Sequence, residues 1–165
     1  MRAAAALALA GLTSPAQADF AAIGRDGPFE VRAVVTDAPD WLSHWQAPNP
    51  AWPDWTNLDT LPTGQGARLM VFFARAGVKQ GRYELDCAIR EMKDGAPTDI
   101  LVAVRCGGFP ATKADDVHMA RFWLDLESKP RDAGDTETFH VEIIDEAAAR
   151  RVVLTPSVTY GEARR

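Results

Sequence analysis

Histidines are the first side chains in this sequence to consider for chemistry. The chain has three, His44, His118 and His140, and none lies at a metal-ligand spacing from another histidine or from a carboxylate. The dipeptide His118-Met119 joins an imidazole to a soft thioether, and both ligand types suit copper. A copper site needs further ligands, which no spacing in the sequence supplies. We therefore interpret these histidines as core or surface residues and expect no metal and no cofactor.

Nucleophiles and paired carboxylates have equally little support in the sequence. Ser43 lies beside His44, but neighbouring side chains in a turn diverge, and no Gly-x-Ser-x-Gly motif is present. Two acidic pairs lack the alternating Asp/Asn pattern with glycine that a calcium loop requires, namely Asp115 with Asp116 and Asp125 with Glu127. Three further carboxylates are expected on solvent-facing strand positions: Glu84, Asp86 and Glu142. The sequence therefore predicts no catalytic residue.

Tryptophan is the exception, because four tryptophans lie close together, at Trp41, Trp45, Trp52 and Trp55. The prolines around them forbid a long helix, so we expect a long ordered loop with one short helical turn after Asp40. Such rings can stack on sugars or anchor a protein partner. The alternative is that the loop crosses an open end of the fold and caps the core. Trp41 and Trp45 are spaced to face inward together, which leaves Trp52 and Trp55 nearer the surface.

The elements that must position these residues are β-strands. Apolar and β-branched runs are separated by Gly, Pro and Asp turn signals. About seven strands are predicted, over residues 29–35, 67–75, 83–89, 100–106, 118–126, 138–144 and 151–158, the last carrying Pro156 as a sign of an edge. This pattern predicts an all-β fold, an antiparallel β-sandwich with a long Trp/Pro-rich loop. Its architecture resembles that of an immunoglobulin domain, but the Cys-Trp-Cys pattern is absent and the resemblance implies nothing about function.

The two cysteines, Cys87 and Cys106, are predicted to form a disulfide. Their strands fold back on each other about the turn at Asp94-Gly95, which brings the cysteines to a cross-strand or diagonal position. A bridge across a loop of this length contributes about 3 kcal/mol in the chain-entropy model. Four residues of the return strand are expected to share one inward face: Ile100, Val102, Val104 and Cys106.

Residues 1–18 have the pattern of a signal peptide. A basic start is followed by an apolar stretch from Ala3 to Leu12 and by the small-x-small site Ala16-Gln17-Ala18. We expect cleavage after Ala18, a single mature domain over residues 19–165, and a location in the periplasm or outside the cell. A disulfide agrees with export, because such bridges persist in oxidising compartments. No later segment is long and apolar enough for a membrane helix, so we expect no membrane insertion.

Net charge narrows the choice of partner. The formal charge is −5, and loss of Arg2 with residues 1–18 gives −5 − 1 = −6. An acidic domain with scattered Lys and Arg has no electrostatic preference for nucleic acid. We therefore expect a non-enzymatic binding or accessory domain that recognises a protein or glycan partner through the aromatic loop. Two alternatives stay open: a small periplasmic hydrolase or carbohydrate-active enzyme, and an envelope assembly or chaperone-like factor that offers a sheet edge to client strands.

Overall fold

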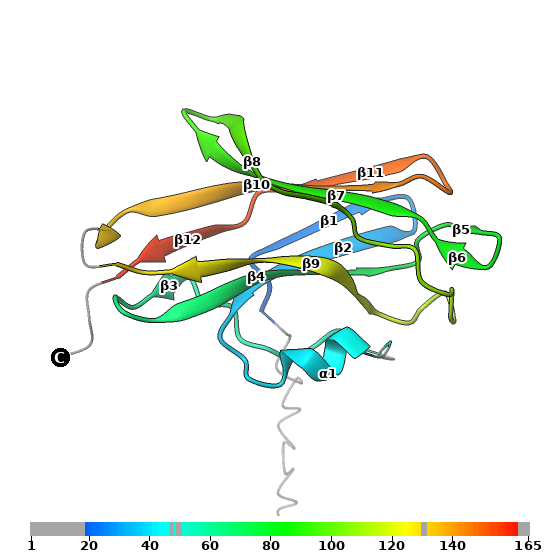
Figure 1. Ribbon diagram of the computed structural model, residues 1–165, viewed down its shortest axis with the longest axis horizontal. Coiled ribbons are helices and arrows are strands. Elements are labelled where there is room, and N and C mark those ends of the chain that lie inside the picture. The colour runs from blue at the N-terminus through cyan, green and yellow to red at the C-terminus, as the bar shows by residue number, and fades with distance from the viewer. Residues whose placement is uncertain (1–18, 47, 49–50, 130–131, 162–165) are drawn as a thin grey trace, which may run out of the picture.

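The computed structural model describes residues 19–46, 48, 51–129 and 132–161 (Figure 1). The signal peptide predicted over residues 1–18 lies outside the described residues. The described chain is all-β, with twelve strands and one six-residue helix, α1 (Trp41–Gln46). In these ranges no helix has the length and apolar character needed to span a membrane.

Four strands form the first sheet, in the order β1-β2-β4-β9, and every pairing in it is antiparallel. The strands are β1 (Ala22–Asp26), β2 (Phe29–Thr36), β4 (Gly66–Ala74) and β9 (His118–Glu127). Almost all residues of β2 and most of β4 are buried. Successive side chains of a strand point to opposite faces, so both faces of this sheet are covered.

The second sheet has the order β3-β12-β10-β7-β8, and β11 also pairs with β10. Its strands are β3 (Thr60–Leu61), β7 (Leu85–Lys93), β8 (Ala96–Arg105), β10 (Thr136–Asp145), β11 (Arg150–Leu154) and β12 (Ser157–Tyr160), and a separate ribbon joins β5 (Val78–Lys79) to β6 (Arg82–Tyr83). β11 and β12 follow one edge of β10, and the break between them contains Pro156, which has no N–H for a ladder. The expected antiparallel pairing holds except between β12 and β3, which are parallel.

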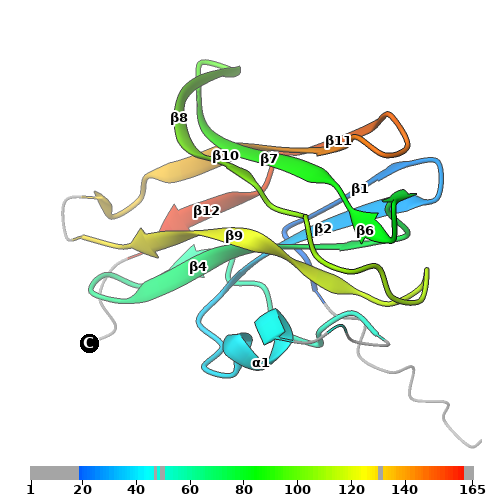
Figure 2. The same cartoon turned by 45° about the vertical axis from the view of Figure 1, so that its right-hand side comes forward.

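The two sheets lie as two layers, and the main hydrophobic core lies between them (Figures 1 and 2). Alternate residues of facing strands fill it, among them Val31, Val71 and Phe73 from the first sheet and Ile89 and Val141 from the second. A second buried cluster covers the outer face of the first sheet, where Val34 and other β2 and β4 residues meet the tryptophan segment. The first sheet therefore lies between two apolar clusters.

The layers close on one side and remain open on the other. On the closed side β1 lies against β11, so closely that a Cβ added to Gly24 would lie 2.6 Å from Leu154 Cδ2. On the opposite side the first sheet ends at β9 and the second ends at β8. Near that side the Arg121 N–H of β9 donates to the Cys106 carbonyl at 3.1 Å, and β8 and β9 are in contact. β8 is therefore the long edge strand of the open side.

The predicted disulfide between Cys87 and Cys106 is confirmed, with the two Cα atoms 5.6 Å apart. Both residues are buried in the main core. Cys87 is directly opposite Val104, which places Cys106 at the diagonal position. The Cys106 N–H donates to the Leu85 carbonyl at 3.0 Å. The disulfide therefore anchors the end of β8 to β7.

β8 departs furthest from the sequence prediction. The expectation that its apolar residues share one buried face is wrong, because Ile100 is 54% exposed and Val104 is 41% exposed. Leu101, expected on the other face, is also 41% exposed. Val104 is opposite Cys87 and faces the space between the layers, but it lies on the open edge, where solvent reaches it.

A β-bulge explains the position of Ile100. Val102 pairs with Ile89 and Ile100 pairs with Arg90, so Leu101 is an extra residue in β8. Ile89 and Arg90 are neighbours in a strand and point to opposite faces. Ile100 therefore lies on the outer face with Arg90, while Val102 faces the core with Ile89.

Candidate functional site

The tryptophan segment covers the outer face of the first sheet rather than an open end of the fold. Trp55 is 8% exposed, and its ring packs edge-on against Phe72 of β4 with centroids 5.5 Å apart. Trp41 and Trp52 are half-buried against the same cluster, and the side chain of Trp45 lies outside the described residues. The expectation that Trp55 lies near the surface is therefore wrong, because the apolar outer face of β4 requires a cover. We call this group the aromatic cover: Phe20, Trp41, Trp52, Trp55 and Trp123.

An arginine stacks on each half-buried tryptophan of this segment. The Arg32 guanidinium carbon lies 4.0 Å from the ring centroid of Trp52, and that of Arg68 lies 5.0 Å from the ring of Trp41. The Trp41 ring also packs against Trp123, with centroids 5.2 Å apart. A sugar needs a free ring face on which to stack. These arginines occupy such faces, so the contacts favour a structural role for the aromatic cover.

A buried carboxylate holds one of these arginines in place. Glu30 accepts hydrogen bonds from Arg25 Nε at 2.9 Å and from Arg32 Nε at 2.6 Å, and Arg75 Nη1 lies 3.7 Å away. Burial by itself raises the pKa of Glu30, but the hydrogen bonds and charges of Arg25 and Arg32 outweigh it and hold the pKa below its ordinary value. The ionised Glu30 orients Arg32 toward Trp52 and so links β2 to the aromatic cover.

His118 lies in the interior among aromatic rings. Its ring stacks on Phe73 with centroids 5.3 Å apart and meets Tyr83 at 4.9 Å and Phe109 at 5.3 Å. Its Nε2 lies 2.9 Å from Thr112 Oγ1. Burial lowers the pKa of His118, so its neutral form is favoured. This is the environment of a core histidine.

The other histidines and Met119 do not join it in a metal site. Met119 belongs to the cluster on the outer face of the first sheet, whereas His118 points to the inner side, so the two cannot hold one copper ion together. His140 is half-buried in β10, and the side chain of His44 lies outside the described residues. Across the described ranges, no group of three or more His, Cys, Asp or Glu could hold a metal ion.

The remaining sequence candidates make local contacts. The Ser43 hydroxyl donates to the Asp40 carbonyl at 2.7 Å. The acidic candidates form ion pairs with nearby cations: Asp115 with Arg75, Asp125 with Arg68, Glu127 with Lys129, Glu84 with Lys79, Asp86 with Arg105 and Glu142 with Arg151. Asp116 accepts from the Lys113 N–H at 3.2 Å. These residues are accounted for by loop and strand contacts.

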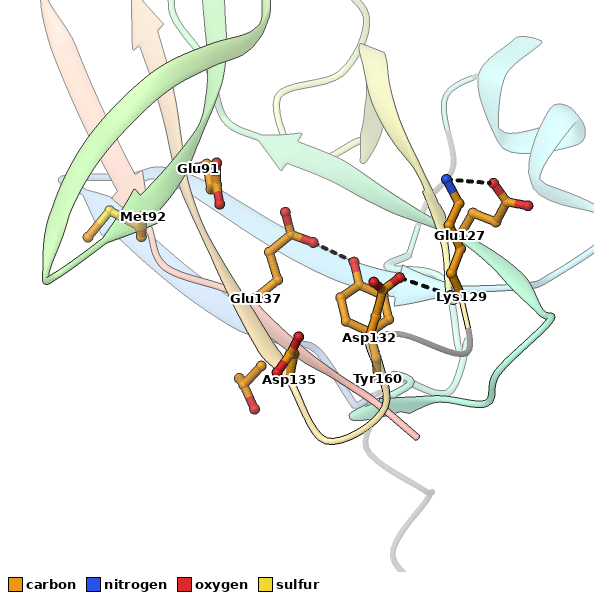
Figure 3. A pocket seen from close by; sticks show the side chains of 9 residues that line it. Glu91, Met92, Glu127, Lys129, Asp132, Asp135, Glu137 and Tyr160 are labelled. Atoms are coloured by element: carbon orange, nitrogen blue, oxygen red, sulfur yellow. Dashed lines mark hydrogen bonds and ion pairs between the residues drawn. The ribbon is translucent and has the colours of Figure 1, made fainter. Parts of the chain in front are cut away.

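A cavity of about 480 Å³ lies where the ends of β7 and β9 meet the start of β10 and the end of β12 (Figure 3). Most of its lining is acidic, and the lining residues are Glu91, Met92, Glu127, Lys129, Asp132, Asp135, Thr136, Glu137 and Tyr160. The Tyr160 hydroxyl donates to the Glu137 carboxylate, and burial together with that carboxylate raises the pKa of Tyr160. Such a lining attracts cations. Sequence analysis missed this cavity because strand ends distant in the chain create it.

The second feature that sequence analysis missed is an apolar surface on β8. Seven large apolar side chains are exposed in the described chain, and three of them lie in this strand. We call them the β8 patch: Ile100, Leu101 and Val104. Charged side chains of Arg90 and Arg105 lie on the same sheet. Ile100 lies on the outer face and Val104 faces the space between the layers, so the patch follows the exposed edge of β8 and does not occupy one face. Exposed apolar groups that lie close together mark interaction surfaces. Alternation in the sequence could not reveal the patch, because the bulge that exposes Ile100 depends on the pairing with β7.

Comparison with known proteins adds no assignment: no protein-family model matches this chain, and no curated protein matches it.

Proposed function

We propose that this chain is an exported, non-enzymatic domain that binds a protein partner through the β8 patch. The carrying observation is that three large apolar side chains are exposed in one edge strand, one of them turned outward at a β-bulge. Bulges re-aim side chains at functional sites, and an apolar patch with a polar rim is typical of protein contact surfaces. The aromatic cover supports recognition less well, since arginines stack on Trp41 and Trp52 and Trp55 is buried.

Export is part of this proposal. The buried disulfide between Cys87 and Cys106 supports it, because disulfides persist in oxidising compartments. Cleavage after Ala18 would leave Asp19 as the first residue, next to Phe20 of the aromatic cover. Intact-mass measurement of periplasmic material tests this point. Recovery of the full-length chain from the cytoplasm alone would contradict it.

We also propose to class the two layers as a β-sandwich. The shared core between the sheets supports this. The likeness to an immunoglobulin domain remains one of architecture: there the disulfide joins the two sheets, whereas Cys87 and Cys106 lie on neighbouring strands of one sheet.

A matched pair of variants tests the binding surface. The patch variant combines Ile100→Ser, Leu101→Ser and Val104→Thr. The control variant changes three apolar residues elsewhere that are at least as exposed: Ile23→Ser, Val78→Ser and Val153→Thr. Both variants should melt close to the parent chain, since surface substitutions usually change stability by no more than about 0.5 kcal/mol.

The readout is quantitative mass spectrometry of proteins captured from envelope extract by the parent chain and both variants. We expect a small set of proteins whose recovery falls at least about tenfold with the patch variant and is kept by the control, the size of effect expected from removing contacts at the centre of an interface. The proposal is overturned if the patch variant captures every protein as well as the parent chain does. It is also overturned if the parent chain captures no protein more strongly than the patch variant.

A further inference from the structure

We infer that the segment bound by β8 is an extended strand that alternates apolar and acidic residues and adds to the open edge of the second sheet. This inference rests on the proposed function and names the mode of binding and the chemistry of the partner.

The backbone of β8 is available for such pairing. Within the described chain β8 pairs with β7 alone. The Cys106 N–H donates to the Leu85 carbonyl, and in an antiparallel ladder hydrogen-bonded and non-hydrogen-bonded residue pairs alternate. Counting back from that bond, Ala103 and Arg105 fall in non-hydrogen-bonded pairs. Their N–H and C=O groups therefore point away from β7, toward the open side.

The free stretch of the edge is short and has defined ends. Before it, two register shifts and Pro97 make β8 irregular, which discourages pairing with another chain. After it, the Cys106 carbonyl accepts the N–H of Arg121 from β9. Residues 102–105 remain between these ends, because Leu101 is the bulge residue. One added strand of about four residues, within the ordinary range of strand lengths, fits this stretch.

The side chains of this stretch differ between the two faces. Val102 and Val104 face the space between the layers, and Val104 is 41% exposed there. Arg105 lies on the outer face opposite Asp86 and remains more than half exposed. It forms ion pairs with two carboxylates of this chain, with its Nε 3.4 Å from Asp86 and its Nη2 3.6 Å from Glu146, and a partner carboxylate would share the exposed guanidinium with them. Residues directly opposite each other in a sheet share a face. An added strand therefore places apolar residues beside the valines and acidic residues beside Arg105.

Charge at this end of β8 favours an acidic partner. Arg82 and Arg121 are exposed and contact the segment that follows β8: Arg82 donates to the Gly108 carbonyl, and the Arg121 guanidinium lies 4.7 Å from the Phe109 ring centroid. Neither forms an ion pair within the described part of the chain. On a chain with a formal charge of −5, this basic corner is complementary to carboxylates and opposed to cationic segments.

Synthetic peptides of about ten residues provide the test. The probe alternates valine and glutamate. The first control has the same composition with the valines and glutamates in separate blocks, and the second alternates valine and lysine. We expect both controls to bind at least about tenfold more weakly by fluorescence anisotropy, because the first loses the alternation of faces and the second reverses the charge.

Two measurements on the protein side connect the peptide to this edge. The double variant Arg82→Glu and Arg121→Glu should weaken binding of the valine-glutamate peptide by at least about tenfold, whereas Lys93→Glu with Lys113→Glu should leave it nearly unchanged. Bound peptide should also slow hydrogen exchange at the amides of Ala103 and Arg105.

The failure of this inference is distinguishable from failure of the proposed function. Equal binding of the block peptide, tighter binding of the lysine peptide, or no binding of the probe overturns strand addition. If the patch variant still loses its captured partner in that case, the proposed function stands with a different mode of contact. If partner capture is also unchanged, both fall.

Discussion

The outer face of the first sheet is covered by tryptophans, whereas the outer face of the second sheet is open to solvent. The difference follows from the strands: β4 has apolar residues on both faces, whereas β7 and β10 alternate buried residues with half-buried polar ones such as Arg90 and Glu142. A strand that is apolar on both faces needs a second layer of cover. On the second sheet that need is absent, so an apolar group such as Ile100, turned outward at a bulge, stands out as a candidate for partner contact.

The strongest test of this comparison is the removal of Trp55 from the aromatic cover. Trp55→Ala should lower the free energy of unfolding by about 3–5 kcal/mol, because truncation of a buried aromatic side chain leaves a cavity against Phe72. Chemical denaturation measures the loss. Trp52→Ala is the matched control and should cost less, since Trp52 is half-buried. A loss below about 1 kcal/mol for Trp55→Ala would show that the cover is not part of the stable fold.

The next largest loss of stability is expected from removing the disulfide that anchors β8, the edge strand on the open side. Replacing Cys87 and Cys106 together by alanine should cost about 3 kcal/mol, since the bridge restricts the unfolded chain. Because β8 pairs with β7 alone in the described chain and none of its side chains is fully buried, its amides should lose protection from hydrogen exchange before those of β4. An equal loss in β4 and β8 would contradict the view that the disulfide anchors an otherwise weakly held edge.

Local patterns predicted the disulfide and the long strands, but they missed β1, β3 and β5 and merged β11 and β12 into one strand. Period-two alternation and turn residues locate β7, and the turn at Asp94-Gly95 brings Cys87 to the diagonal of Cys106. The same reasoning failed for β8, because one extra residue, Leu101, changes which face its neighbours occupy and no local pattern records it. The position of the tryptophan segment also depends on tertiary packing, because Trp55 packs against Phe72 on the apolar outer face of β4.

A smaller loss of stability should appear on acidification, and it arises from His118 in the core between the two sheets. Burial lowers the pKa of His118, so below its ordinary value of 6.5 the unfolded chain binds a proton more readily than the folded chain. The stability contributed by the neutral ring is thus fully present above pH 6.5 and is lost as the pH falls through the folded-state pKa. Thermal melts between pH 7 and 5 should show this loss as a fall in Tm.

The variant His118→Phe should flatten that slope, because it keeps an aromatic ring beside Phe73 and removes the titrating group. Glu30 gives a separate acid transition, since its lowered pKa makes its contribution fall only below about pH 4.5. A slope between pH 7 and 5 that survives in His118→Phe would assign the effect to another group.

The smallest expected effect separates two neighbours on β8. Ile100→Ser should change the free energy of unfolding by no more than about 0.5 kcal/mol, because its side chain is 54% exposed on the outer face. Val102→Ser should cost about 1–2 kcal/mol more, because Val102 packs against the main core opposite Ile89 and its replacement places a hydroxyl there. The two residues have the same parity in sequence, so simple alternation predicts equal losses. They differ only because the extra residue Leu101 places them on opposite faces. If chemical denaturation gives equal losses in the free energy of unfolding for the two variants, the bulge does not explain why Ile100 is exposed on β8.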